Sequence, residues 1–364
     1  MKTNNRKESA MDTLLMKEEQ GDIVYEKAGS ILRKGGLVAF PTETVYGLGG
    51  NALDHTAAEK IYAAKGRPSD NPLIVHICNE EMMEPLVSVI HPKARKLMDV
   101  FWPGPLTLIF PKTDKVPYET TGGLDTVAIR FPSHECARKI IASANVPIAA
   151  PSANVSGRPS PTIAQHVIED MNGRIDMIVD GGNVGIGVES TIVDVSGETP
   201  MILRPGFVTK QMIEQIVGEV LVDAAVTKKV SETVHPKAPG MKYRHYAPKA
   251  PLTIVSGKEK AVANKILDMV KEKQEEKQKV GIICTTETKL FYLKEQKQAY
   301  APIIKVIGSK QDSKAIAHNL YSILREFDNE NVSMILSEDV SIGLLKEAIE
   351  NRLMKAAGHN IIHV

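Results

Sequence analysis

"LVAFPTETVYGLGGNALDHTAAEKIYAAKGRPSDNPLIVHI" (residues 37–77) is the stretch that decides the fold class. Its first four residues (37–40) are apolar and precede a polar, Gly-rich segment, so they predict a short buried strand. Residues 54–65 have the spacing of a helix, and Asp54 is a favoured residue at a helix N-cap. The apolar run 73–77 predicts a second strand after that helix. A strand, a helix and a strand in this order are typical of an α/β domain.

The same alternation continues beyond this stretch. Short β-branched runs predict further strands at 106–110, 126–131, 146–150, 176–180 and 190–195. Helical spacing predicts further helices at 91–101, 133–144 and 162–171. Ser133 is a plausible N-cap for the second of these helices. We therefore expect a mixed α/β domain over residues 22–207, preceded by a flexible polar tail over residues 1–21.

A second strand and helix pattern follows residue 250. The apolar runs 252–257, 279–286, 303–308 and 332–338 alternate with helical stretches around 258–275, 312–326 and 341–356. This alternation predicts a small, parallel, Rossmann-like sheet in a second domain over residues 251–364. The second domain has no Gly-rich phosphate turn, which favours an accessory or scaffold role. Residues 208–250 hold one helical segment and a Pro-rich run, and we interpret them as a linker.

Composition limits the classes of partner. The 45 Lys and Arg residues nearly balance the 44 Asp and Glu residues, and the formal net charge is +1. A protein that binds duplex nucleic acid usually carries a clear basic excess, so any anion site here must be local. The three cysteines are far apart and form no C-x-x-C pair, which argues against a disulfide framework and favours the reducing cytoplasm. No apolar run reaches the length of a membrane span, so no membrane partner is expected.

Common catalytic and nucleotide motifs are missing from the sequence. It holds no G-x-x-x-x-G-K-[ST], no G-x-S-x-G and no pair of residues spaced to hold a resident metal. The Gly-rich run 181–190 leads into a strand rather than a helix, so it is not a dinucleotide fingerprint. A hairpin-like connection and a ligand-lining loop are equally compatible with that run.

Four cations stand at the ends of predicted elements. Lys65, Arg67, Arg130 and Arg204 all lie beside Pro, Gly or Ser. Each alone fits an ordinary role, because Lys and Arg favour helix C-termini and exposed strand ends. Together, in a chain of balanced charge, they predict a pocket for a polyphosphate or a carboxylate. A triphosphate bound without a P-loop would bring its own Mg²⁺.

The motif set resembles the YrdC-type threonylcarbamoyl-AMP synthases over about residues 22–207, and the two-domain layout looks like their long form. The matching motifs occur in family order: "PTETVYGLGGNA", "KGRPSDNPLIVH", "FWPGPLTLI", "TVAIRFP", "APSANVSGRPSPT" and "ESTIVD…ILRPG". The resemblance implies a YrdC-like catalytic domain that joins L-threonine, bicarbonate or CO₂, and ATP into threonylcarbamoyl-AMP and pyrophosphate. It also implies a downstream transferase complex that modifies tRNA beside the anticodon, with no stable nucleic-acid binding by this chain.

The resemblance also implies roles for particular residues. Lys65 and Arg67 would act in catalysis. The residues that would hold L-threonine are Thr44, His76, Arg130, Ala150 and Ser190. The residues that would hold ATP are Arg67, Asn71, Thr126, Ser152, Asn154, Ser160, Arg204 and Tyr243. The irregular segment "KAPGMKYRHYAP" (237–248) would fold over the pocket as a lid that excludes water.

Two other functions compete with this interpretation. A double-stranded RNA or ribosomal RNA binding protein would explain the clustered cations, but the balanced charge and the absence of RNP-type or GXXG motifs argue against it. A carbamoyl-adenylate enzyme with a different acceptor, as in hydrogenase maturation, would need a zinc-finger region that three scattered cysteines cannot form.

Overall fold

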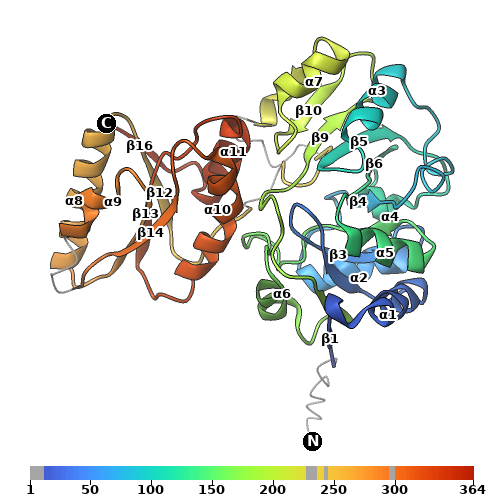
Figure 1. Cartoon of the computed structure of the whole chain (residues 1–364), viewed down its shortest axis with the longest axis horizontal. Coiled ribbons are helices and arrows are strands. Elements are labelled where there is room, and N and C mark those ends of the chain that lie inside the picture. The colour runs from blue at the N-terminus through green and yellow to red at the C-terminus, as the bar shows by residue number, and fades with distance from the viewer. Residues whose placement is uncertain (1–11, 227–235, 242–244, 295–299) are drawn as a thin grey trace, which may run out of the picture.

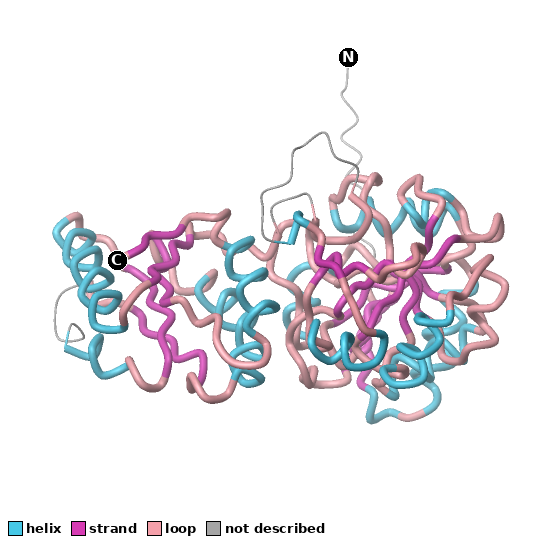
Figure 2. Tube along the Cα trace, turned by 90° about the horizontal axis from the view of Figure 1, so that it is seen from above, coloured by secondary structure: helices cyan, strands magenta, loops and turns pink. Residues whose placement is uncertain are grey.

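The chain folds into two lobes that lie side by side (Figures 1 and 2). The computed structural model describes residues 12–226, 236–241, 245–294 and 300–364. The first lobe is built on a large mixed sheet and the second on a smaller parallel sheet, which confirms the α/β class. Within the described ranges, no helix is long and apolar enough to cross a membrane.

The sheet of the first lobe has the strand order β1-β8-β2-β3-β7-β4-β6-β5-β9-β10-β11 among the described residues. Both parallel and antiparallel pairs occur in it, so it is a mixed sheet. Its strands are β1 (Leu14–Lys17), β2 (Val38–Pro41), β3 (Tyr46–Asn51), β4 (Ile74–His76), β5 (Leu106–Pro111), β6 (Thr126–Arg130), β7 (Ile148–Ala149), β8 (Met177–Asp180), β9 (Thr191–Asp194), β10 (Met201–Arg204) and β11 (Leu221–Val222).

Helices connect these strands. They are η1 (Glu18–Gln20), α1 (Asp22–Arg33), α2 (His55–Lys65), α3 (Pro92–Phe101), α4 (Tyr118–Thr121), α5 (Glu135–Ala144), α6 (Ala164–Met171), α7 (Lys210–Val217) and η2 (Ala224–Val226). The side chain of Asp54 accepts a hydrogen bond of 2.9 Å from the backbone N–H of Thr56, so the predicted cap of α2 is confirmed. Such a cap contributes about 1 kcal/mol. Ser133 does not cap α5, because the helix begins one residue later and His134 occupies the N-cap.

Two expectations for the first lobe are wrong, and one of the two alternatives for the run 181–190 is excluded. Residues 14–17 are not part of a flexible tail, since they form β1 and pair in parallel with β8. Residues 46–51 are a strand rather than a loop, and β3 forms a hairpin with β2. The run 181–190 is no hairpin, because β8 and β9 lie far apart in the sheet.

The segment 208–250 is only partly a linker. Helix α7 packs against α3, and its Ile213 is fully buried. Strand β11 then pairs in parallel with β10, so both elements belong to the first lobe. The helix forms because Thr209 caps it and because its apolar residues lie on one face.

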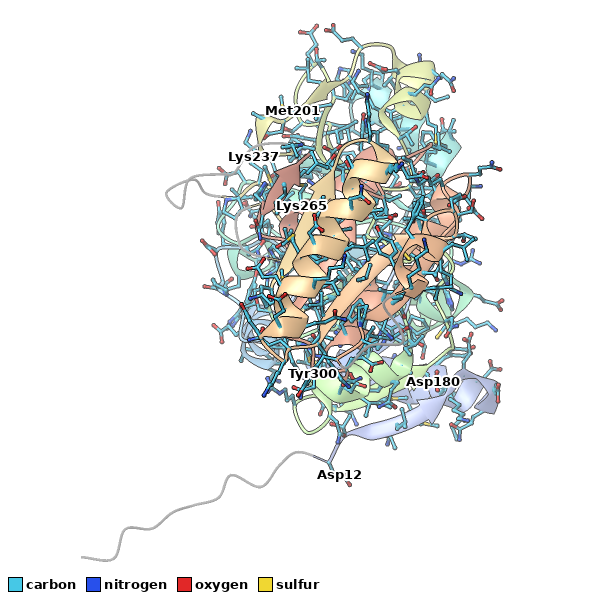
Figure 3. The ribbon with its side chains drawn as sticks, turned by 90° about the vertical axis from the view of Figure 1, so that its left-hand side faces the viewer. Asp12, Asp180, Met201, Lys237, Lys265 and Tyr300 are labelled. Carbon is cyan, nitrogen blue, oxygen red and sulfur yellow. The ribbon has the colours of Figure 1, made fainter. Side chains whose placement is uncertain are left out.

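The second lobe is a parallel sheet with the order β14-β13-β15-β12-β16, as the Rossmann-like prediction requires. Helices α10 and α11 cover the side that faces the first lobe, and α8 covers the outer side, where Figure 3 labels Lys265. The elements are β12 (Leu252–Ser256), α8 (Glu259–Glu275), β13 (Val280–Thr285), α9 (Lys289–Tyr292), β14 (Ile303–Gly308), α10 (Ser313–Phe327), β15 (Met334–Glu338), α11 (Lys346–Ala356) and β16 (Ile361–His363). The sequence pattern missed β16, which is only three residues long.

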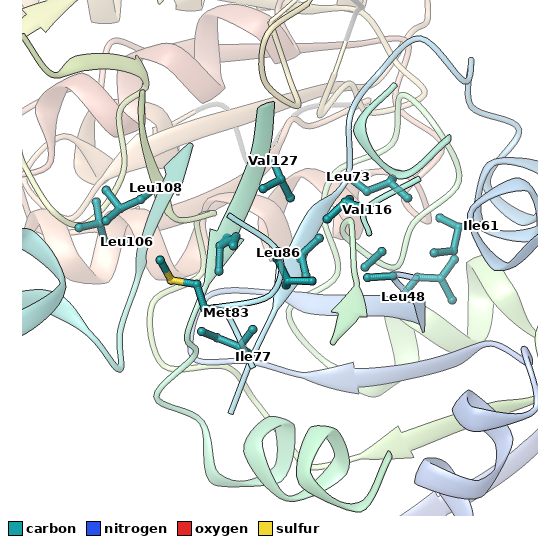
Figure 4. Packing of buried hydrophobic residues seen from close by; sticks show 14 of the residues in the cluster. Leu48, Ile61, Leu73, Ile77, Met83, Leu86, Leu106, Leu108, Val116 and Val127 are labelled. Carbon is teal, nitrogen blue, oxygen red and sulfur yellow. The ribbon is translucent and has the colours of Figure 1, made fainter. Parts of the chain in front are cut away.

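Apolar packing joins the two lobes. The main core of the first lobe includes Leu48, Ile61 and Leu108 (Figure 4). The main core of the second lobe extends across the boundary, because Val188 and Tyr246 belong to the same cluster as the residues of α10 and α11. Burial of such side chains contributes roughly 1.5–3 kcal/mol each. The lobes are therefore held together by a continuous apolar contact.

Candidate active site

A pocket of about 610 Å³, part of it open to solvent, lies in the first lobe next to the second lobe. Its walls come from the strand ends of β4, β6 and β10, from the loop after β7, and from residues 239–240 and 245–246. The predicted site residues that line it are Arg67, His76, Arg130, Ala150, Ser152, Asn154, Ser190 and Arg204. Residues scattered over nearly 140 positions of sequence therefore meet at one place.

Three buried arginines face this pocket. Arg67 donates from Nη2 to the carbonyls of Asn71 and Pro72, each at 3.3 Å, while its Nε has no hydrogen-bond partner among the described residues. Arg204 donates from Nε to the carbonyl of Ser190 and from Nη2 to the Ser190 hydroxyl, both at 3.1 Å. Burial lowers the pKa of Arg67 to about 10, which leaves the group charged at neutral pH.

Arg130 is the third of these arginines. Its guanidinium lies 2.8 Å from the carboxylate of Glu43, and its Nε has no hydrogen-bond partner within the described part of the chain. A buried donor without a partner costs about 1–3 kcal/mol. The free donors of Arg67 and Arg130 indicate that the pocket is completed by an anionic ligand.

Two histidines beside the pocket are neutral. Burial is the main cause that lowers the pKa of His76 to about 3, and the charge of Arg130 is the second cause. Burial likewise lowers the pKa of His245 to about 3, and the charge of Arg67 adds to the effect. The Nδ1 of His76 lies 3.0 Å from the carbonyl of Ile74, so the proton is on Nδ1 and Nε2 can accept a hydrogen bond. The Nε2 of His245 has no partner among the described residues.

Lys65 lies behind the pocket wall rather than in it. Its ammonium donates to the carbonyl of Ser152 and, at 2.7 Å, to the carbonyl of Asn154. The Asn154 amide in turn donates to the carbonyls of Val155 and Arg158 at 2.8 and 2.9 Å. Lys65 therefore fixes the loop that carries Ser152 and Asn154, and it is not among the residues that line the pocket.

The remaining predicted residues lie outside the wall. Thr44 is fully buried, and its hydroxyl lies 2.9 Å from the hydroxyl of Thr42, which does line the pocket. Asn71 contacts Arg67 through its carbonyl, and Thr126 is the half-buried first residue of β6. Ser160 is buried one step behind the pocket, against Glu189. Tyr243 lies outside the described residues.

Glu189 is a site residue that the sequence pattern did not single out. Its Oε1 accepts a hydrogen bond of 2.5 Å from Ser160, and its Oε2 accepts from Tyr321 at 2.8 Å and from Arg352 at 3.1 Å. Burial would raise the pKa of this carboxyl, but Arg352 and Arg204 lower it to about 2. The one local signal was an acidic residue directly before Ser190 at the start of a strand. Its partners in the second lobe, Tyr321 and Arg352, stand in no sequence motif that would have indicated their contact with Glu189.

Two family models match the chain. A model of the Sua5/YciO/YrdC type, described as telomere recombination, matches residues 30–206. A model of the C-terminal domain of threonylcarbamoyl-AMP synthase matches residues 208–358. The fold and the pocket thus define a two-domain protein with a YrdC-like first lobe.

Curated relatives narrow this class. A threonylcarbamoyl-AMP synthase of Pyrococcus abyssi is 48% identical over 93% of this chain and 95% of its own length. The synthase of Bacillus subtilis is 47% identical over 92% of this chain and 93% of its own length. The crystal structure of P. abyssi Sua5 complexed with L-threonine has a TM-score of 0.88 at 45% identity, and covers 97% of this chain and 99% of that one. The chain belongs to the threonylcarbamoyl-AMP synthase family and is an enzyme, as the motifs indicated.

Proposed function

We propose that this chain makes L-threonylcarbamoyl-AMP from L-threonine, bicarbonate or CO₂, and ATP, with release of pyrophosphate. The observation that carries the proposal is the set of buried, unpartnered arginine donors at Arg67 and Arg130, which suits a ligand with both phosphates and a carboxylate. The L-threonine complex of the P. abyssi relative supports threonine as the amino acid.

The arrangement divides into two halves. Arg130, with His76 next to it, would hold the threonine carboxylate, while Thr44, Ala150 and Ser190 would complete that half of the site. Arg67 and Arg204 would neutralise the phosphates of ATP. Of the other predicted residues, Ser152, Asn154, Asn71, Thr126, Ser160 and Tyr243 would bind the nucleotide or position its binding groups.

The chemistry needs little from side chains beyond positioning. The threonine amine adds to CO₂ and loses a proton, or condenses with bicarbonate and expels water, to form a carbamate. A carbamate oxygen then attacks the α-phosphorus and displaces pyrophosphate. Buried arginines stabilise the negative charge on the phosphoryl oxygens and the leaving pyrophosphate without needing to reorganise. His76 and His245, which also line the pocket, add no charge at neutral pH, because burial lowers the pKa of each to about 3.

We propose that Mg²⁺ enters with ATP rather than as a resident ion. Among the described residues, no three His, Cys, Asp or Glu side chains gather as ligands for a metal. The donors at the pocket are cations, and both oxygens of the nearby Glu189 carboxylate already accept hydrogen bonds, three in total. This surface fits an ion carried by phosphate oxygens.

We further propose that the segment 237–248 covers the pocket. Its described residues Gly240, His245 and Tyr246 already line the wall. A cover of this kind would protect a labile carbamoyl adenylate from water. The product would pass to a downstream transferase complex that modifies tRNA, and we infer that the reaction takes place in the cytoplasm.

The test is threonine-dependent release of pyrophosphate from ATP with Mg²⁺ and bicarbonate, with serine and no amino acid as controls. Release that needs both threonine and bicarbonate is expected. Arg130→Lys keeps the charge but loses the forked geometry, so it should raise the KM for threonine more than the KM for ATP. A folded protein that releases no pyrophosphate, but binds RNA with a steep salt dependence, would favour the RNA-binding alternative.

A further inference from the structure

The pocket contains a carboxylate where the proposed function needs an anion site. Glu189 lines the wall next to Arg204, and its side chain is 8% exposed. An unneutralised carboxylate here would repel the phosphates of ATP, because charge interactions are strong in a buried site. The protein must therefore cancel or redirect this charge.

The second lobe supplies the groups that do so. Tyr321 on α10 donates its hydroxyl to Oε2 of Glu189 at 2.8 Å, and Arg352 on α11 donates its Nε to the same oxygen at 3.1 Å. Both side chains are fully buried. Arg352 also donates to the carbonyls of Pro205 and of Glu189 itself, so its guanidinium is fixed by the first lobe. Figure 1 shows α10 and α11 on the side that faces the first lobe.

The network also sets the hydrogen-bonding direction of Ser160. The Ser160 hydroxyl uses its one proton in the 2.5 Å bond to Oε1 of Glu189. Its oxygen can then only accept a hydrogen bond. A phosphate at neutral pH has little to donate, whereas a ribose hydroxyl or an adenine amino group is a donor. Ser160 itself lies one step behind the wall, so the network fixes the Glu189 side of the pocket rather than contacting a phosphate.

We propose that Tyr321 and Arg352, on the second lobe, are positioning residues for the nucleotide half of the pocket, acting through Glu189 and Ser160. The proposal rests on the function given above, in which ATP binds here. It gives the second lobe a specific part in the reaction, since without these two side chains the Glu189 charge would be compensated only by Arg204 and the Ser160 hydroxyl, at the place where ATP binds. The described hydrogen bonds of these two side chains include none with Arg130, which lies in the threonine half.

The test compares two tyrosines in matched environments. Tyr321→Phe removes the hydroxyl donor to Glu189 and keeps the ring, which stacks on Tyr246 with centroids 5.1 Å apart. Tyr292→Phe is the control, because Tyr292 is also fully buried and donates to a buried carboxylate, Glu338, at 2.7 Å. Tyr321→Phe should raise the KM for ATP by about three- to tenfold, with the KM for threonine changed less than about twofold. Tyr292→Phe should leave both KM values unchanged.

A second experiment tests whether Arg352 compensates the charge of Glu189. Arg352→Gln should raise the KM for ATP by about tenfold or more, since it leaves the Glu189 carboxylate without its main neutralising partner. Adding Glu189→Gln removes the excess negative charge, so the double variant should recover part of the ATP affinity. Circular dichroism and thermal melting confirm that each variant is folded.

Several outcomes would overturn the proposal. An equal rise of both KM values, an unchanged KM for ATP in Tyr321→Phe, or the same effect from Tyr292→Phe would each reduce these residues to structural supports. Wild-type pyrophosphate release is measured first, and its absence counts against the proposed function alone. ATP binding by calorimetry then tests the positioning role on its own, and an ATP affinity that is equal in wild type and Tyr321→Phe would contradict it.

Discussion

The ammonium of Lys65 donates a hydrogen bond of 2.7 Å to the backbone carbonyl of Asn154, 89 residues further along the chain. The end of α2 is thereby fastened to the loop after β7, which lines the pocket. Burial and then Arg67 lower the pKa of Lys65 well below its usual range, so the hydrogen bonds to the two carbonyls hold this group against a strong desolvation penalty.

Lys65→Met should therefore act through the loop. It leaves the carbonyls of Ser152 and Asn154 without their donor, which we expect to cost about 2–3 kcal/mol of unfolding free energy and to raise the KM for ATP. Lys60→Met is the control on the same helix. Lys60 donates a hydrogen bond of 2.6 Å to the backbone carbonyl of Gly35, and it does not line the pocket. Urea unfolding measures the stability of the two variants, and steady-state kinetics measures their KM for ATP. An unchanged KM for ATP in Lys65→Met would show that Lys65 does not position the loop for ATP binding.

Two glycines of the run 181–190 make a second matched pair. Gly187 and Gly182 both have positive φ, +87° and +78°. A Cβ at Gly187 would lie 2.4 Å from the Cα of His318 on α10, whereas a Cβ at Gly182 has nothing within 4 Å. Gly182→Ala should cost about 1 kcal/mol from backbone strain alone. Gly187→Ala should cost more than that and displace the run from α10, which chemical denaturation and proteolysis of the run would detect. Equal costs would show that the close approach is unimportant.

Arg325 fastens the second lobe to the first. Its Nη2 donates to Asp170 and to the carbonyl of Pro159, both at 2.7 Å, and the residue is 2% exposed. Arg325→Met leaves a buried carboxylate partly unpaired, so we expect a loss of about 3–5 kcal/mol. Arg95→Met removes the exposed ion pair with Glu80 and should cost less than about 1 kcal/mol. Similar melting temperatures for the two variants would contradict this account.

The buried histidine on α6 should make the protein sensitive to acid. Burial and Arg325 lower the pKa of His166 to about 4. Below its ordinary pKa of about 6.5, the unfolded chain binds a proton that the folded chain does not, so stability falls as the pH drops from about 6.5 towards 4. His166→Gln should reduce the loss of unfolding free energy between pH 7.5 and pH 5 by roughly 1–2 kcal/mol. Urea titrations at the two pH values measure it, with the exposed His363→Gln as control. An unchanged pH dependence in His166→Gln would rule out this contribution.

Much of the fold could be predicted from the sequence because buried strands are continuous apolar runs between caps and turns. Strand β3 could not be predicted from the sequence, because "YGLGGN" has the composition of a loop. The structure gives the reason: a Cβ at Gly49 would lie 2.6 Å from the ring of Phe40 on β2. Close packing of the hairpin leaves no room for a side chain at Gly49. The glycine that the packing requires is also a residue that is not typical of strands, so the sequence pattern does not predict β3.

The site was predictable only where its residues carry a local signal. Arg67, Arg130 and Arg204 stand at element ends beside turn residues, and the structure brings all three to one pocket. The bond between Glu189 and Arg352 spans 163 positions and depends on how two lobes pack. No periodicity or spacing in the sequence encodes that distance, so the second lobe's share in the pocket became visible only in three dimensions.

Strand β1 covers the edge of strand β8, which would otherwise be the outer strand of the sheet. Strand β8, which it covers, is buried through Met177, Ile178 and Val179. A chain that began at Met16 would lack half of β1 and would leave the N–H and C=O groups along this edge of β8 open. Unprotected apolar edges recruit strands from other molecules. Shortening the N-terminus to that point should therefore cause self-association and poor recovery of the protein, even though every residue of the pocket is retained.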